Sequence, residues 1–133
     1  MAVPPGIEER ELIYLAGFFD GEGYVGISGR RPELHVKVAG TNKASIVRFQ
    51  HLFGGSLSKY SDRYQRRETW GWDVVSFNAK NFLETVLPYL AIKKIQAAEA
   101  LKFPLNGRGK RLSPGQWDGR RVLSERLAIL KRL

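Results

Sequence analysis

The chain has 133 residues, 43% of them hydrophobic, which is enough for one globular core and too little for two. No stretch approaches the roughly 18 unbroken apolar residues of a membrane span, and residues 1–10 lack the apolar core of a signal peptide. Cysteine is absent, which excludes disulfides, thiolate metal sites and cysteine nucleophiles. We therefore expect one soluble, intracellular domain, in cytoplasm, nucleoid or organelle, without a membrane partner.

Basic residues outnumber acidic ones, with 22 Lys and Arg against 13 Asp and Glu and a formal net charge of +9. This charge attracts polyanions at long range, so nucleic acid is the first partner to consider. Ribosome-associated domains and basic domains with no specific site carry similar charge. The positions of the basic residues must decide between these classes.

Apolar residues in the first half follow the spacing of a helix, then of two strands, then of a second helix. Residues 8–20 are apolar on two sides, so this helix should contact its own sheet on one side and a partner on the other. Residues 24–30 and 33–39 alternate like the strands of a hairpin, with one polar face. Residues 43–53 return to helical spacing and end at a Gly-Gly pair typical of a helix C-terminal cap.

The second half repeats this order and adds a helix. Its expected elements are strands at 56–60 and 69–77, helical segments at 78–87 and 91–103, and a final helix at 113–133. Pro88 separates the two helical segments, and Ser113 with Pro114 fits the start of the last helix. Trp72 alternates with Val74 and is expected in the core rather than on a ligand.

Two successive α-β-β units predict an α+β fold with one four-stranded antiparallel sheet and helices on a single face. The expected organisation is one domain over residues 1–133, with an αββαββα core at 8–106 and a C-terminal helix at 113–133. The other face of the sheet would be uncovered. We expect the function to depend on that face.

The uncovered face and its basic turns carry the side chains that we predict to bind DNA. A ribbon of this kind fits the major groove, where side chains can read base edges. A solvated face would also be polar, but it seldom has arginines clustered at both turns. The candidates are Tyr24, Ser28, Arg30, Arg31, Glu33, His35, Lys37, Ser58, Tyr60, Arg63, Arg66 and Arg67.

The first helix has Gly17 and Gly21 four residues apart, on one face, where missing side chains would let another backbone approach closely. The chain has only one such segment, so the natural partner is the same helix of a second copy, related by a two-fold axis. Alternatively, Gly17 packs against its own sheet, and Gly21 and Gly23 end the helix. The candidate dimer-interface residues are Ile13, Ala16, Gly17, Asp20 and Gly21.

Glu22 stands where this helix should end and the next strand begin. A two-fold axis would bring two copies of Glu22 together beside the DNA backbone, where they repel each other and the phosphates. Mg²⁺ removes this repulsion, because it binds one or two carboxylates together with phosphate oxygens and water. Such a metal can polarise a phosphoryl oxygen and orient a water molecule.

The segment LAGFFDGEG, at 15–23, together with this element order, resembles the LAGLIDADG homing endonucleases that carry a single motif per chain. The resemblance implies a homodimer joined through the motif helix, with saddle-shaped sheets in the major groove of double-stranded DNA. It implies metal-dependent phosphodiester hydrolysis that breaks both strands of a long, near-palindromic site, and a gene associated with intron or intein mobility. It makes Glu22 the metal ligand, with the carbonyl oxygen of Gly21 beside it, and Asp20 a helix-end residue. The metal would be Mg²⁺, and Mn²⁺ or Ca²⁺ could occupy the same sites.

The other active-site positions of that family match less evenly. The resemblance implies Lys93, in LPYLAIKKIQAAEA, as the catalytic lysine, with Lys94 as the second choice, and Asn42 as the catalytic polar residue after the second strand. Gln96 lies one helical turn from Lys93 and would support it. A basic residue that some relatives carry falls on Ile46 here, which departs from the pattern. Without the resemblance, Lys93 would be interpreted as a solvated lysine at a helix start.

Two other functions remain open from the sequence. A non-cleaving nucleic-acid-binding protein on the same scaffold, either an intron RNA maturase or a DNA-binding regulator, would keep the basic sheet and would not need Glu22. A structural basic domain without a specific site would bind DNA with steep salt dependence and no sequence preference. The retained acid favours the endonuclease.

Overall fold

The protein is described here from a computed structural model over residues 6–28, 32–60, 68–105 and 114–132. The element order matches the expectation from the sequence. The elements are α1 (Glu9–Glu22), β1 (Gly23–Ser28), β2 (Glu33–Gly40), α2 (Lys43–Phe53), β3 (Ser56–Tyr60), β4 (Thr69–Val75), α3 (Ser76–Val86), the 3-10 turn η1 (Leu87–Tyr89), α4 (Lys94–Ala100) and α5 (Pro114–Leu130).

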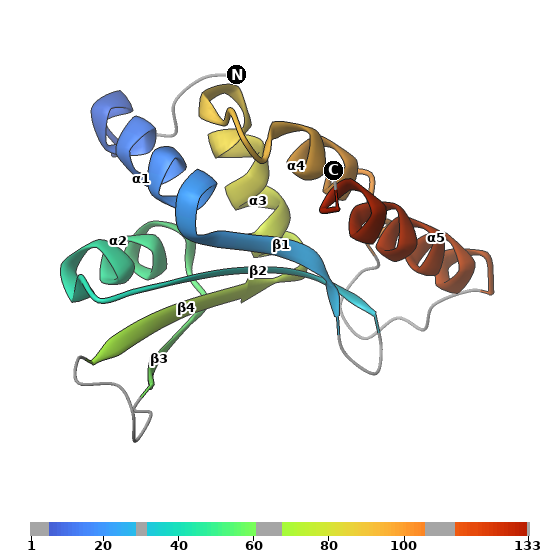
Figure 1. Ribbon diagram of the computed structural model, residues 1–133, viewed down its shortest axis with the longest axis horizontal. Helices are drawn as coiled ribbons and strands as arrows, with labels where there is room; N and C mark the ends of the chain where they lie inside the picture. The colour runs from blue at the N-terminus through green and yellow to red at the C-terminus, as the bar shows by residue number, and fades with distance from the viewer. Residues whose placement is uncertain (1–5, 29–31, 61–67, 106–113, 133) are drawn as a thin grey trace.

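The four strands form one antiparallel sheet in the order β1-β2-β4-β3, so the two hairpins join through β2 and β4 in the middle (Figure 1). The register pairs Val25 with Val36, and Val36 with Val74. Facing residues on neighbouring strands project to the same side, so these valines lie on one face of the sheet. They are buried beneath the helices, whereas the opposite face, called here the outer face, carries the polar residues of the strands.

Aromatic side chains from three helices and one strand fill the core. The Trp72 ring stacks on Phe49 of α2 and meets Phe82 of α3 edge-on, each with 5.0 Å between centroids. Phe19 of α1 contacts Phe82 at 5.1 Å, and all four rings are fully buried. The Trp72 indole N–H donates to the carbonyl of Gly54 at 2.7 Å. The expectation that Trp72 belongs to the core is confirmed.

Helix α5 packs along α4 and β1 and adds an anchor beyond the αββαββα core (Figure 1). The Arg120 guanidinium is buried and donates to the carbonyl oxygens of Pro104 at 3.1 Å and Pro32 at 2.7 Å. It also pairs with Glu33 at 3.2 Å. Burying a charge is costly unless it is paired and hydrogen-bonded. These partners therefore hold α5 against the start of β2.

Strand β4 ends at Val75, two residues earlier than expected. Ser76 adopts a φ of 55°, uncommon for a residue with a side chain, and turns the chain directly into α3. The predicted glycine cap at the end of α2 is confirmed, because Gly54 and Gly55 have φ values of 75° and 93°.

Helix α4 begins at Lys94 rather than at residue 91. The carboxylate of Asp20 accepts hydrogen bonds from the backbone N–H groups of Ala91 and Lys93, at 2.7 and 2.9 Å. This segment is therefore held outside the helix by a side chain from α1, which helical periodicity could not reveal.

Among the helices of the described ranges, none combines the length and the apolar character needed to cross a membrane.

Candidate active site and nucleic-acid face

Glu22 is the last residue of α1, and its side chain is exposed. The next residue, Gly23, closes the helix through its N–H to the Phe19 carbonyl. A Cβ at Gly23 would lie 2.6 Å from that carbonyl oxygen and closer still to the Phe19 ring, so only glycine fits. The junction thus fixes where Glu22 leaves the helix.

The carboxylate of Asp20 lies just before this junction and faces inward. Asp20 is 8% exposed, and both its oxygens accept backbone hydrogen bonds from the chain that leads into α4. It therefore joins α1 to the segment that carries Lys93. This is the helix-end role implied by the resemblance.

Lys93 is held against the end of α1 rather than free in solvent. Its Nζ donates to the backbone carbonyl of Asp20 at 2.6 Å and lies 5.9 Å from the centroid of the Phe19 ring. The last carbonyls of a helix lack helical partners and carry partial negative charge, so they attract cations. Lys94 is exposed and Gln96 is half-buried on α4.

Lys131 is a second lysine near this end of β1, and it was missed from the sequence. Its Nζ lies 3.9 Å over the ring of Tyr24, and a Cβ built at Gly26 would be 3.1 Å from it. Burial, and then the positive charge of Lys93, lower the pKa of Lys131 below its usual range. No sequence signal could have found Lys131, because only the packing of α5 on β1 brings it here.

Glu22 and Gly21 offer a carboxylate and a main-chain carbonyl oxygen in the same helical turn. Within the described residues, no three His, Asp or Glu side chains are grouped so that they could hold a metal. Mg²⁺ typically uses one or two carboxylates and completes its shell with phosphate oxygens and water. Hard oxygen donors of this kind fit such a cation.

The exposed stripe of α1 consists of Ile13, Gly17 and Gly21, at successive helical turns. A Cβ at either glycine would meet nothing within 4 Å, so the alternative in which Gly17 packs against its own sheet is wrong. Ala16 and Asp20, which we also expected in a dimer interface, are instead 0% and 8% exposed. Ala16 lies in the chain's own core and Asp20 binds its own backbone, so neither offers a side chain to a second copy.

A hydrogen-bonded chain of three side chains crosses the outer face from β1 to β4. Ser28 Oγ lies 2.8 Å from His35 Nδ1, and His35 Nε2 lies 2.8 Å from Asp73 Oδ1. Ser28 and His35 were predicted from the sequence, whereas Asp73 was not. Its alternation with Trp72 and Val74 was a usable signal, but its distance from His35 depends on the strand register.

The other predicted DNA-binding residues are distributed unevenly. Tyr24 and Lys37 are exposed on the outer face, and Ser58 is half-buried there. Glu33 binds Arg120 and accepts a hydrogen bond from Ser76 at 2.8 Å, so its carboxylate serves the chain's own packing. Tyr60 pairs with Thr69 at the end of β3. The predicted arginines at both turns lie outside the described residues, namely Arg30, Arg31, Arg63, Arg66 and Arg67.

No family model and no curated protein matches the chain, but solved structures do. The homing endonuclease I-CvuI, in complex with its target in the presence of Ca, superimposes with a TM-score of 0.75 at 23% identity, covering 91% of this chain and 82% of its own. The archaeal intron-encoded homing endonuclease I-Vdi141I, complexed with DNA, superimposes with a TM-score of 0.73 at 21% identity, covering 93% of this chain and 86% of its own. The group I intron-encoded homing endonuclease I-CeuI, complexed with DNA, superimposes with a TM-score of 0.53 at 16% identity, covering 75% of this chain and 56% of its own.

This chain has the homing-endonuclease fold. The α+β class and the four-stranded antiparallel sheet predicted from the sequence are thereby confirmed. The fold places the motif helix α1 directly before the first strand, with Glu22 at their junction.

Within this homing-endonuclease fold, Asn42 caps α2, because its side-chain oxygen accepts from the N–H of Ser45 at 3.1 Å. The register pairs Gly23 with Val38, so β2 continues past the start of β1 toward the end of α1. Asn42 therefore lies at the same end of the sheet as Glu22. Asn42 itself is exposed.

The position at which the resemblance implied a basic residue is apolar in this chain. Ile46 is fully buried in the core. The basic side chains nearby in sequence are engaged elsewhere: Lys43 lies 4.4 Å over the ring of Trp70, and Arg48 forms an ion pair with Glu11. The isoleucine at this position therefore serves the packing of the core.

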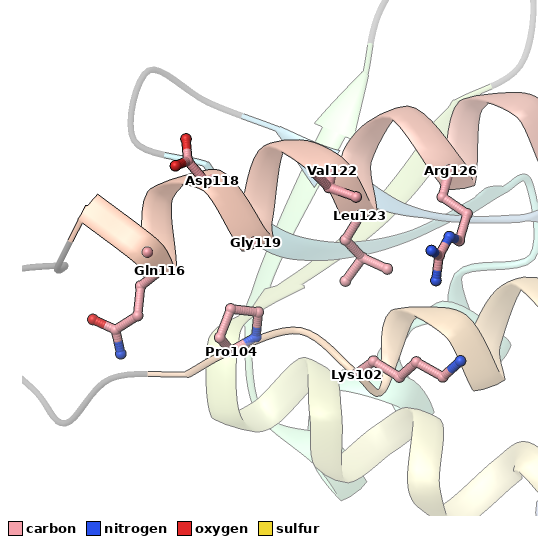
Figure 2. A pocket seen from close by; sticks show the side chains of 9 residues that line it. Lys102, Pro104, Gln116, Asp118, Gly119, Val122, Leu123 and Arg126 are labelled. Atoms are coloured by element: carbon pink, nitrogen blue, oxygen red, sulfur yellow. The ribbon is translucent and has the colours of Figure 1, made fainter.

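A pocket of about 580 Å³ lies between α5 and the chain that follows α4 (Figure 2). Leu123 and Pro104 face each other across it, with Lys102 and Arg126 at one end. It shares no lining residue with the end of α1 or with the outer face. The pocket is therefore separate from the candidate site.

Proposed function

We propose that the chain is a homodimeric, divalent-metal-dependent endonuclease that breaks both strands of a long, near-palindromic DNA site. The observation that carries the proposal is the arrangement at the end of α1. Glu22 is exposed there, Gly23 fixes the turn, and Lys93 holds its ammonium on the adjacent carbonyl. I-CvuI and I-Vdi141I, which have this fold, are described in complex with DNA.

The glycine stripe supports the dimer. Each glycine inside a helix costs about 1 kcal/mol relative to alanine. The described part of the chain gives no steric reason for Gly17 or Gly21, since alanine would fit at both. A second α1 across a two-fold axis supplies the reason, because the bare surface lets the two backbones approach and also covers Ile13. That contact would bring two copies of Glu22 near the axis.

At each scissile phosphate, the side chains would divide the chemistry as follows. Glu22 and the Gly21 carbonyl would hold the cation, which would supply polarisation of the phosphate and an oriented water molecule. Lys93 places a fixed ammonium beside this site and stabilises negative charge that develops on phosphate oxygens. Lys131 adds a second ammonium close to Lys93, suited to binding a neighbouring phosphate.

The remaining catalytic assignments are Asn42 and Gln96, which would orient water at the same end of the sheet. The cation is Mg²⁺ in this proposal. Neighbouring structures support a divalent cation, since those of I-CvuI were obtained in the presence of Ca or of Mg. DNA would lie across the outer face, where Tyr24 and Lys37 are exposed.

The decisive experiment exchanges Glu22 for Gln. A binding site is first selected from random duplex DNA and cloned into a supercoiled plasmid, which the native protein with Mg²⁺ should linearise. Glu22→Gln should bind that site as the native protein does and cut at least about a thousandfold more slowly, because it loses the carboxylate that holds the cation. Glu125→Gln, an exposed exchange on α5, is the matched control and should cut normally. Undiminished cutting by Glu22→Gln would contradict the proposal.

The second candidate is a non-cleaving binder on the same scaffold, either an intron RNA maturase or a DNA-binding regulator. The buried Ile46 favours it, because the chain lacks a basic side chain at that position. This candidate requires that the native protein bind its selected DNA, or intron RNA, without linearising the plasmid in Mg²⁺. Equal behaviour of the native protein and Glu22→Gln in that assay would establish the binder.

A further inference from the structure

The Ser28–His35–Asp73 chain has a hydrogen-bond polarity that follows from its partners. The two bonds run across three neighbouring strands of the outer face, each 2.8 Å long. The side chains of His35 and Asp73 are 19% and 29% exposed, so the chain is held in the sheet and still reaches the surface. It lies where the proposed function places DNA.

The carboxylate fixes which ring nitrogen carries hydrogen. An ionised carboxylate only accepts, so Nε2 of His35 must donate to Asp73. In a neutral ring Nδ1 then has a lone pair and must accept from the Ser28 hydroxyl. Ser28 has thereby used its only hydrogen, and its oxygen can only accept from any group that lies over it.

Protonation of His35 reverses the first bond. Both ring nitrogens then donate, so Ser28 Oγ accepts from Nδ1 and its hydroxyl hydrogen is released to point outward. One proton on His35 therefore changes Ser28 from an acceptor into a donor. Asp73 accepts in both states.

The major groove distinguishes these two states. Cytosine N4 and adenine N6 are donors there, whereas guanine O6 and N7 and thymine O4 are acceptors. Phosphates offer only acceptors, which the Ser28–His35–Asp73 chain would repel while the His35 ring is neutral. The chain is thus suited to a base edge and not to the DNA backbone.

We infer that the Ser28–His35–Asp73 chain is a base-reading element in which His35 selects amino-bearing base edges, cytosine or adenine, and loses this preference on protonation. The inference rests on the proposed function, because it requires DNA on the outer face. It assigns His35 a positioning role, since the contact with the base is made by Ser28.

The charged groups around His35 include both signs. Asp73 comes from β4, and Lys37 and Glu33 flank the histidine on β2. Arg120 of α5 forms an ion pair with Glu33. The arginines of the β1–β2 turn lie outside the described residues. Because acids and bases are both present, exchange of His35 itself is needed to assign any pH effect to it.

The test selects bound sequences from random duplex DNA at about pH 8 and about pH 5.5, on either side of the range in which histidine side chains titrate. At the higher pH, one position per half-site should favour cytosine or adenine by about fivefold, the size expected of one hydrogen bond. The preference should vanish at the lower pH, while other positions keep theirs. Ser28→Ala should lose it at both values.

Two variants assign the effect. His35→Gln can accept from Ser28 and donate to Asp73 without titrating, so it should keep the preference at both pH values. His51→Gln removes the other histidine, exposed on α2, and should behave like the native protein. Native selection with no pH-dependent position, or a Ser28→Ala profile equal to the native one, would overturn the inference and leave the endonuclease proposal intact. Absence of any enriched sequence at either pH would overturn both.

A measurement on the protein alone checks the polarity. Nitrogen-15 NMR distinguishes a ring nitrogen that carries hydrogen from one with a lone pair. Neutral His35 should carry its hydrogen on Nε2, facing Asp73. A neutral ring with its hydrogen on Nδ1 would reverse the argument for Ser28 and overturn the inference without any use of DNA.

Discussion

The two sides of α1 contrast sharply in what their residues contact. On the inner side, Ala16 and Phe19 pack in the core, and Gly23 must be glycine because Phe19 leaves no room for a Cβ. On the outer side, the space where Gly17 and Gly21 would carry a Cβ is open. The comparison teaches that glycines in one motif can have different causes. The cause of Gly23 lies within the chain, whereas the proposed dimer supplies the cause of the other two.

The largest expected effect in this comparison is that of Gly23→Ala. The added methyl would overlap the backbone oxygen and ring of Phe19, so the free energy of unfolding should fall by about 2–3 kcal/mol, typical of overpacking. Urea denaturation followed by tryptophan fluorescence measures it, since Trp72 lies in the same core. An unchanged unfolding midpoint would mean that the junction can relax, and the contrast with Gly17 would disappear.

Gly17→Ala should have two effects of opposite sign. The monomer should gain about 0.5–1 kcal/mol in free energy of unfolding, because alanine is the better helix former and finds open space. The dimer should weaken by at least about tenfold in dissociation constant, because two added methyls would separate the helices at the axis. Sedimentation equilibrium and denaturation at low concentration measure the two quantities.

Gly115→Ala is the matched control for that exchange. Gly115 is also helical, on α5, and its Cβ position is equally open. The control should leave the dissociation constant unchanged. If Gly17→Ala dimerises like the native protein, the glycine stripe is not the interface.

The smallest expected effect is the contribution of Glu11 to stability at different pH values. A hydrogen bond from Arg48 lowers the pKa of Glu11, which lies on the boundary between the two sides of α1. A lowered carboxyl pKa stabilises the fold above the ordinary value, and this contribution is lost as the pH falls through the lowered value. The native protein should therefore lose slightly more stability than Glu11→Gln between about pH 7 and about pH 3. Urea denaturation at both pH values measures this, and parallel losses would show that the pair contributes nothing.

Much of the fold could be predicted because its signals are local. Alternation identified both hairpins, helical spacing identified α1 and α2, and the Gly-Gly pair marked the end of α2. The residues of the candidate site could be predicted only in part from such local signals. Helical spacing showed that α1 is apolar on two sides but could not tell which side meets its own core, so Ala16 and Asp20 were assigned to the wrong one.

The sequence by itself determined the order of helices and strands, the polar outer face and the position of Glu22 at the end of α1, because these depend on residues close together in the chain. Only the tertiary structure decided that Asp20 holds Lys93, that Lys131 lies over Tyr24, and that β2 pairs with β4. Those contacts join segments far apart in sequence. They are set by strand register and by how helices fill the core, and no local period carries that information.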